Sequence, residues 1–171
     1  MTKFIKSLTA VLGAFLTVLM AVIVIDVVWQ VVTRFVLKNP SSYTEELAGF
    51  LLIWIGLLGA SYALYTRAHP GIDLLTGRLR GRQKKAAELG TWALVFLFAL
   101  FILLIGGIRL VRLTYTLKQI SPAIGMPMAW VYAVLPLSGV LMMIYSGYFI
   151  ALALRGKSAA PAHADSTCEE G

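Results

Sequence analysis

Four long apolar stretches constrain the fold of this chain more than any other feature of its sequence. They cover residues 8–28, 47–65, 89–108 and 126–154, and Asp26 is the only charged residue in them. Because each helical residue adds about 1.5 Å, about 20 apolar residues cross the roughly 30 Å of hydrocarbon in a bilayer. The sequence therefore predicts an all-α integral membrane protein, with four transmembrane helices in a membrane domain of residues 1–155.

The composition favours a lipid environment over water. Of the 171 residues, 59% are hydrophobic and 13% are charged, whereas about 25% are charged in an average soluble domain. Such a chain has too few polar side chains to cover a soluble globule. The net charge of +7 comes from short basic clusters between the apolar stretches, which favours anionic lipid over nucleic acid as the charged partner.

The residue types give little support to a cofactor, metal or catalytic site. Cys168 is the single cysteine, so an intrachain disulfide cannot form. His69 and His163 both lie outside the apolar stretches and do not provide paired haem ligands within the membrane. His69 and Asp73 could share a metal or a proton, but the Pro70–Gly71 pair between them is first of all typical of a turn. We expect neither an enzyme nor a bound cofactor.

Lysine and arginine predict how the chain lies in the membrane. Ten of them are in the two tails and the loop between the second and third spans, and five are in the other two loops. Because cytoplasmic loops carry the excess, we expect both termini and the central loop to lie in the cytoplasm. Trp29, Trp92 and Trp130 lie near predicted span ends, as in an aromatic belt at the membrane surface.

The central loop and the C-terminal segment have different predicted roles. Ile72, Leu75 and Leu79 recur at helical spacing, which predicts a short amphipathic helix in the interface between spans two and three. The basic residues expected at the lipid surface are Arg78, Arg82, Lys84 and Lys85. Each would gain roughly 1 kcal/mol near anionic lipid. Residues 156–171 are rich in alanine, serine and acid, and we expect a disordered cytoplasmic tail.

Asp26 is the one acid inside a predicted span. Intramembrane acids are functional candidates because burial at mid-bilayer costs at least about 2.5 kcal/mol. Asp26, however, lies near the end of the first span, two residues before Val28 and about two turns before Arg34. Its role is therefore either that of an interfacial or paired structural acid or that of a proton or ion site.

A helix-capping pattern precedes the second span. Ser42 and Glu45 match the S-x-x-E capping box, directly before the apolar residues that begin at Leu47. The cap leaves the neighbouring Glu46 without a role. Either Glu46 is a local surface acid or it forms a salt bridge to Arg34, to Lys38 or to a partner chain.

The second and fourth spans carry signs of close helix packing. In span two, small residues recur at three- and four-residue spacing at Gly56, Gly59, Ala60 and Ala63, which allows another helix to approach closely. Trp54 lies in mid-span, where a tryptophan is more often buried against protein. The contact is equally compatible with an internal helix and with another subunit. In span four, Pro136 predicts a bend.

In this order and spacing, several short stretches resemble the DctQ-like small membrane subunits of tripartite ATP-independent periplasmic (TRAP) transporters. The resemblance covers most of residues 20–145. It is carried by Arg34-Phe35, Glu45-Glu46-Leu-Ala, Trp54-Ile-Gly-Leu-Leu-Gly59-Ala60, His69 to Asp73, Ser121 to Tyr132, and Leu135-Pro136-Leu.

The resemblance implies an accessory role in solute uptake across the bacterial inner membrane. In such systems a periplasmic binding protein captures a carboxylate-bearing solute, a large membrane subunit moves it with sodium, and the small subunit braces the large one. The binding protein is then a transient partner, and the substrate, catalytic and metal sites are not on this chain. The candidate residues for the interface with the partner are Arg34, Glu45, Glu46, Trp54, Gly56, Gly59, Ala60, Pro127, Tyr132 and Pro136.

One alternative belongs to a different functional class. An autonomous four-span carrier of the small multidrug type exchanges protons for cations through an acid in its first span. Asp26 is the residue that would serve in this way. Such an acid must face a cavity near mid-membrane, so its position distinguishes the two interpretations.

Overall fold

The computed structural model describes residues 2–36, 38, 42–66 and 82–154. Its helices are α1 (Thr2–Phe35), α2 (Ser42–Tyr65), α4 (Arg82–Phe98), the π-helix η1 (Ala99–Gly106), α5 (Gly107–Thr116), α6 (Met128–Tyr132) and α7 (Val134–Leu154). Four helical stretches among them are long and apolar enough to cross a membrane. The predicted all-α membrane fold is confirmed. The expected amphipathic segment around Ile72–Leu79 and the tail 156–171 lie outside the described residues.

The spanning helices are longer than the apolar stretches from which they were predicted. They cover Ile5–Phe35, Ser42–Tyr65, Leu89–Thr116 and Met128–Ala153. The first continues past the predicted end at Val28, because Trp29–Phe35 contains no helix-breaking residue. Pro40 is the next residue that opposes helix, since proline disfavours the helical conformation of the residue before it.

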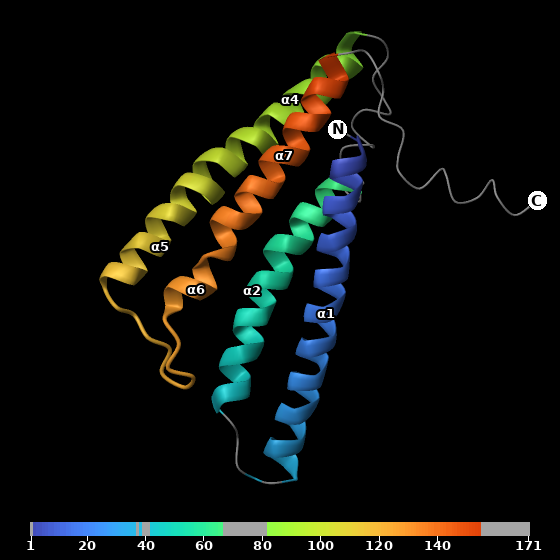
Figure 1. Cartoon of the computed structure of the whole chain (residues 1–171). Coiled ribbons are helices and arrows are strands. Elements are labelled where there is room, and N and C mark those ends of the chain that lie inside the picture. The colour runs from blue at the N-terminus through green and yellow to red at the C-terminus, as the bar shows by residue number, and fades with distance from the viewer. Residues whose placement is uncertain (1, 37, 39–41, 67–81, 155–171) are drawn as a thin grey trace, which may run out of the picture.

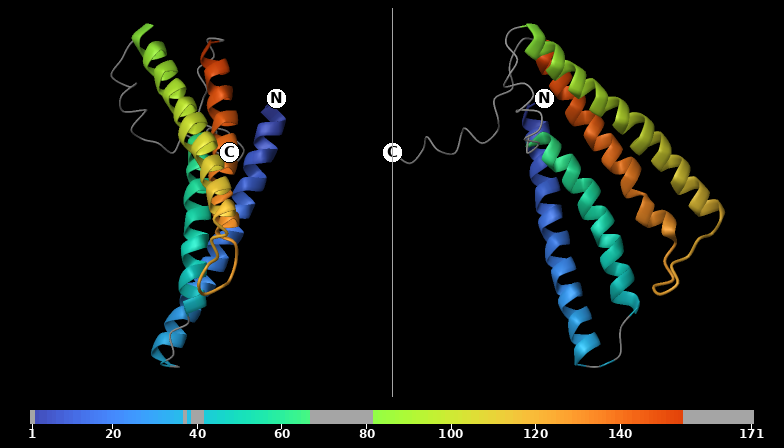
Figure 2. Two further views of the ribbon diagram at one scale, coloured as in Figure 1. Left: turned by 90° about the vertical axis from the view of Figure 1, so that its left-hand side faces the viewer. Right: turned by 180° about the vertical axis from the view of Figure 1, so that it is seen from behind.

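The helices form two antiparallel pairs (Figures 1 and 2). One pair is α1 with α2, and the other joins the continuous rod α4–η1–α5 to α6 and α7. The pairs meet where α2 packs against α7 and diverge toward the end that carries the α1–α2 connection and the loop 117–127 (Figure 1). We call this the loop end, and the opposite end, where the N-terminus and the end of α7 lie, the terminal end.

A regular seam on α1 holds the first pair together. Its buried and half-buried side chains recur at alternating spacings of four and three residues, at Ile5, Thr9, Leu12, Leu16, Leu19, Ile23, Asp26, Gln30 and Thr33. This seven-residue repeat is the packing pattern of left-handed helix pairs. Most other side chains of α1 are apolar and exposed, as expected for a surface that faces lipid or another protein.

Aromatic side chains from three helices pack together at the terminal end. Trp92 of α4 stacks on Phe149 of α7 with ring centroids 4.4 Å apart, and Tyr65 of α2 lies 5.2 Å from Tyr145 of α7. The prediction that Trp92 belongs to a lipid-facing belt is wrong, because Trp92 is only 3% exposed and sits in this core. Trp29 and Trp130 are exposed.

Two glycines, Gly107 of α5 and Gly139 of α7, bring the rod of η1 and α5 into close contact with α7. A Cβ atom on Gly107 would lie 2.9 Å from the Pro136 nitrogen, and one on Gly139 would lie 3.0 Å from the Leu104 nitrogen. Only glycine allows backbones to approach this closely. The helix interruption at Ala133 lies three residues before Pro136, whose ring prevents regular helix over the preceding turn.

Candidate functional site: surfaces for helix contact

Glu46 fastens the loop 117–127 to the first helix pair. One of its carboxylate oxygens accepts hydrogen bonds from the backbone N–H groups of Ala123, at 2.9 Å, and of Ile124, at 3.1 Å. Two neighbouring amides directed at one carboxylate form the kind of small anion-binding concavity called a nest. Glu46 thus binds backbone amides of its own chain, a contact that neither interpretation of Glu46 from the sequence included.

The loop is shaped to present those two amides. The Gly125 N–H donates to the Ser121 carbonyl at 3.0 Å, and the Ser121 N–H donates to the Met126 carbonyl at 2.9 Å. Gly125 has a φ of +74°, which glycine adopts without strain. The sequence offers a turn signal here in Ser121-Pro122 and Gly125, but nothing in it identifies Glu46 as the residue that the turn binds.

The other charged candidates near the loop end are free of such contacts. Arg34, Lys38 and Glu45 are exposed. The Arg34 guanidinium lies 6.0 Å from the centre of the Phe35 ring, which is compatible with a cation–π contact. Arg34 and Glu45 therefore remain accessible to a partner.

The small residues of α2 divide between an open face and a packed one. Gly49, Leu52 and Gly56 are exposed at spacings of three and four residues, and a Cβ atom on Gly56 or Gly59 would meet nothing within 4 Å. Ala60, in contrast, packs against the core cluster. Within this chain, the open face is available for another helix.

Two other candidates in the spans make internal contacts. Trp54 is half-buried and meets Phe15 of α1 edge to face, with ring centroids 6.5 Å apart. Pro136 lies against the position of Gly107. Both residues support the fold from inside the chain.

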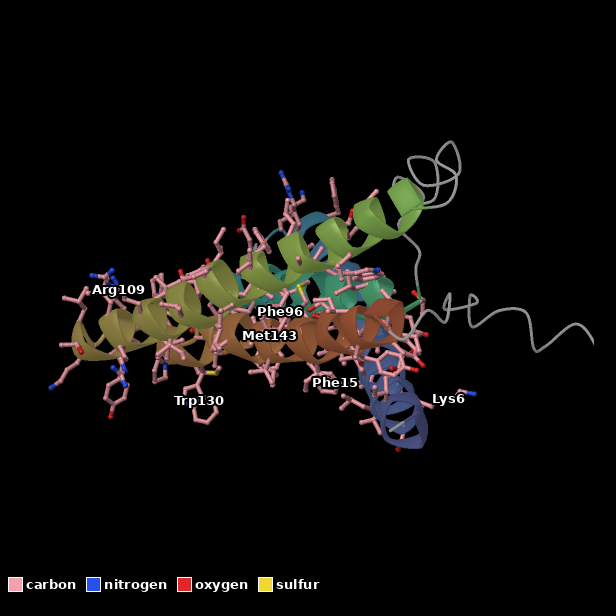
Figure 3. The ribbon with its side chains drawn as sticks, turned by 90° about the horizontal axis from the view of Figure 1, so that it is seen from above. Lys6, Phe15, Phe96, Arg109, Trp130 and Met143 are labelled. Atoms are coloured by element: carbon pink, nitrogen blue, oxygen red, sulfur yellow. The ribbon has the colours of Figure 1, made fainter. Side chains whose placement is uncertain are left out.

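The start of the fourth span carries exposed side chains. Pro127 caps α6 in an extended conformation and is exposed, while Tyr132 is half-buried. Trp130, in the same short helix, is 68% exposed, and Figure 3 shows it projecting outward from the helix pair. Figure 3 also shows Arg109 of α5 at the periphery of the bundle.

Asp26 lies on the seam between α1 and α2. It is 8% exposed, and its buried Oδ2 atom has no hydrogen-bond partner among the described residues. Gln30 and Thr33 follow it on the same seam, and the Thr33 hydroxyl donates to the Gln30 carbonyl at 2.9 Å. Across the described ranges, His, Cys, Asp and Glu nowhere gather in a group of three that could hold a metal ion.

Some predicted residues fall where the structure gives no side-chain information. Arg78, His69 and Asp73 lie outside the described residues. Arg82, Lys84 and Lys85 belong to the first turn of α4, of which only the backbone is described.

Comparison with known proteins identifies the family. The sequence model described as "Tripartite ATP-independent periplasmic transporters, DctQ component" matches residues 23–156. The chain belongs to this family. The match includes residues 23–35 of α1 and all the described helices after it, so the surfaces described above lie on a TRAP small-subunit fold.

Three relatives show how the family varies. The sialic acid TRAP transporter permease protein SiaT of Haemophilus influenzae is 30% identical over 142 residues, which are 82% of this chain but 22% of SiaT. The small permease protein SiaQ of Vibrio cholerae is 28% identical over 127 residues, or 73% of this chain and 70% of SiaQ.

The third relative has a different solute in its name. The C4-dicarboxylate TRAP transporter small permease protein DctQ of Rhodobacter capsulatus is 31% identical over 100 residues, or 58% of this chain and 44% of that protein. The chain thus spans about a fifth of SiaT and a larger part of the two proteins named as small permeases.

Proposed function

We propose that this chain is the accessory small membrane subunit of a TRAP-type uptake system and that it braces a large transport subunit in the bilayer. The family match over residues 23–156 carries this proposal. SiaT also supports the proposal. The segment that matches this chain is only 22% of SiaT, so in SiaT the counterpart of this chain is one part of a much larger permease protein.

The open face of α2 is the proposed contact with the large subunit. Lipid tails are as apolar as leucine, so helices associate in a membrane through close packing of small residues. Gly49 and Gly56 are exposed, and a partner helix could approach both without displacing any side chain of this chain. Arg34, Glu45 and Pro127 are the exposed candidates for contacts outside the membrane.

The solute of the system is proposed to carry a carboxylate group and to enter with sodium. The relatives named above support a carboxylate-bearing solute, because two of them are named for sialic acid and one for C4-dicarboxylates. Recognition of the solute is assigned to the large subunit and to a periplasmic binding protein that docks transiently.

We further propose that the chain lies in the inner membrane with both termini in the cytoplasm and the loop end outside. The distribution of basic residues supports this orientation, because ten are on the terminal side and five on the loop side. Trp29 and Trp130, both exposed toward the loop end, would then lie at the outer surface of the membrane.

Co-purification tests the proposed function. The tagged chain is co-expressed with the large permease of the same system and extracted in mild detergent. We expect a stoichiometric complex, and we expect Gly56→Leu combined with Gly59→Leu to reduce its recovery. Gly90→Leu on α4 is the matched control, because a Cβ there also meets nothing within 4 Å. Recovery of the chain alone, or as a homodimer, would contradict the proposal.

Transport in proteoliposomes tests the coupling. Uptake should require the chain, the large subunit, the binding protein and an inward sodium gradient together. Solute uptake by the chain alone would instead favour an autonomous carrier, and uptake without a sodium gradient would remove the sodium part of the proposal.

A further inference from the structure

Helix α1 is longer than a bilayer requires. Its apolar span Ile5–Phe35 has 31 residues. At about 1.5 Å per residue it is about 46 Å long, against about 30 Å of hydrocarbon. Burying all of it would need a tilt of about 50°, beyond the range of about 0–40° seen for membrane helices. Part of α1 therefore leaves the hydrocarbon.

The register of α1 against α2 shows which part leaves. Gly13 faces the ring of Tyr62, and both Trp29 and Glu46 lie 16 residues from that contact, so Trp29 and Glu46 are at about the same depth. Glu46 binds the amides of the loop 117–127. An irregular, largely exposed loop is not stable in contact with hydrocarbon, so this depth marks the membrane edge.

The end of α1 continues beyond that edge. Figures 1 and 2 show it extending past the loop 117–127 and past the start of α2. We call residues Trp29–Val36 the α1 tip. The tip is helical to its end, because the Val36 N–H still donates to the Val32 carbonyl at 2.9 Å.

The α1 tip has its polarity reversed relative to a helix in water. The residues that face α2 are polar, namely half-buried Gln30 and buried Thr33. Apart from Arg34, the exposed residues of the tip are apolar, with exposed fractions of 37–73%, and they are Trp29, Val31, Val32, Phe35 and Val36. A contiguous apolar patch outside the membrane marks a surface that another protein covers.

The chemistry of the tip indicates a permanent, membrane-embedded partner. Aromatic and aliphatic side chains with one arginine, here Arg34 beside Phe35, are typical of the centre of a stable interface, whereas transient encounters use more charge. The exposed apolar surface also continues along α1 from Val24 and Val28 in the membrane into the tip. A partner embedded in the membrane can cover this continuous surface on both sides of the membrane edge, whereas a protein outside the membrane can cover only the tip.

We propose that the α1 tip docks on an apolar surface of the large permease subunit just outside the membrane. This inference rests on the proposed function, and it adds a second contact to the open face of α2. A second copy of this chain and the binding protein are the other partners that the test must distinguish.

Cysteine accessibility tests the proposal. Cys168→Ser removes the native thiol, and Val31→Cys then reports on the α1 tip, where Val31 is 50% exposed. Gln119→Cys, in the exposed loop at the same end, is the matched control. A membrane-impermeant maleimide is applied to membrane fragments that expose both faces. The fragments contain the chain alone, the chain with the large subunit, or both with the binding protein.

We expect the large subunit to slow labelling at Val31→Cys by about tenfold or more, since labelling then requires local opening of the interface. Labelling at Gln119→Cys should not change. Equal labelling of Val31→Cys with and without a co-purifying large subunit would overturn the inference but leave the proposed function standing. Failure of the large subunit to co-purify would overturn both.

Two further outcomes point to other partners. If Val31→Cys is already protected in the chain alone, lipid or a second copy covers the tip. If protection appears only with the binding protein, that protein covers it. Either result contradicts docking on the large subunit. As an independent check, Val32→Asp in the tip should reduce recovery of the complex, whereas Gln119→Asp should not.

Discussion

The Glu46 carboxylate accepts a hydrogen bond from the Ala123 N–H at 2.9 Å and so joins the two helix pairs at the end where they diverge. Elsewhere the pairs are linked by the Ser61 hydroxyl, which lies 3.4 Å from the Ser138 carbonyl, and by Thr9, which meets Tyr145. These polar links lie at three depths, so the relative position of the pairs is set along the whole bundle.

Removing the Glu46 carboxylate should loosen the loop. Glu46→Ala leaves the Ala123 N–H without its acceptor, whereas the Ile124 N–H keeps the Ser121 hydroxyl at 3.3 Å. We therefore expect hydrogen exchange to accelerate by about tenfold or more at Ala123 and by less at Ile124. Glu46→Gln retains a neutral acceptor and should have a smaller effect. Glu45→Gln, at an exposed neighbouring position, is the control and should leave exchange unchanged. Unchanged exchange in Glu46→Ala would show that the loop holds its shape without Glu46.

The contact of η1 and α5 with α7 should tolerate no added methyl group. Gly107→Ala places a Cβ 2.9 Å from the Pro136 nitrogen, and overpacking of this kind costs about 1–3 kcal/mol. Thermal unfolding in detergent should show a clear loss for Gly107→Ala and for Gly139→Ala. Gly90→Ala has free space and should be neutral or slightly stabilising, because alanine favours helix by up to about 1 kcal/mol over glycine. Equal stability of all three variants would contradict the close contact.

The sequence predicts the existence of the four spanning helices well, because an apolar stretch of about 20 residues crosses the hydrocarbon as a helix that satisfies its own backbone hydrogen bonds. It predicts the ends of these helices less well. The first apolar stretch ends at Val28, whereas α1 continues to Phe35. A count of apolar residues registers only hydropathy, whereas polar residues such as Gln30 and Thr33 can continue a helix. The helical conformation is lost by Lys38, which has a φ of +50°.

Side-chain contacts between distant segments were harder to predict. Trp92 is a tryptophan near the end of a predicted span, as expected for an aromatic belt. Its side chain nevertheless stacks on Phe149, because α4 packs on α7 with this face of the helix. Glu46 and Ala123 are 77 residues apart in the chain. The buried seam of α1, in contrast, could have been predicted from the sequence. Its seven-residue repeat includes Asp26, which is buried, and leaves out Val28, which is exposed.

The hydrogen bond between Thr9 and Tyr145 should contribute modestly to the packing of α1 on α7. The two hydroxyls lie 3.2 Å apart, and Thr9 also donates to the Ile5 carbonyl at 2.8 Å. Hydrogen bonds between membrane helices average about 0.6 kcal/mol in double-mutant cycles, so Tyr145→Phe should cost about that amount. A cycle with Thr9→Val isolates the coupling, and a coupling energy near zero would show that the two hydroxyls have no net interaction.

Substitution of Asp26 separates a structural acid from a transport site. Its Oδ2 atom is buried on the seam without a partner in the described part of the chain. Removing a buried, unsatisfied oxygen should therefore be favourable, and Asp26→Leu should raise stability by about 1 kcal/mol or more because leucine suits a seam position. Asp26→Asn keeps the size and polarity and should change stability less. We expect both variants to support solute uptake when the large subunit and binding protein are present. Loss of uptake in Asp26→Asn, with the complex still recovered intact, would assign the acid a direct role in transport.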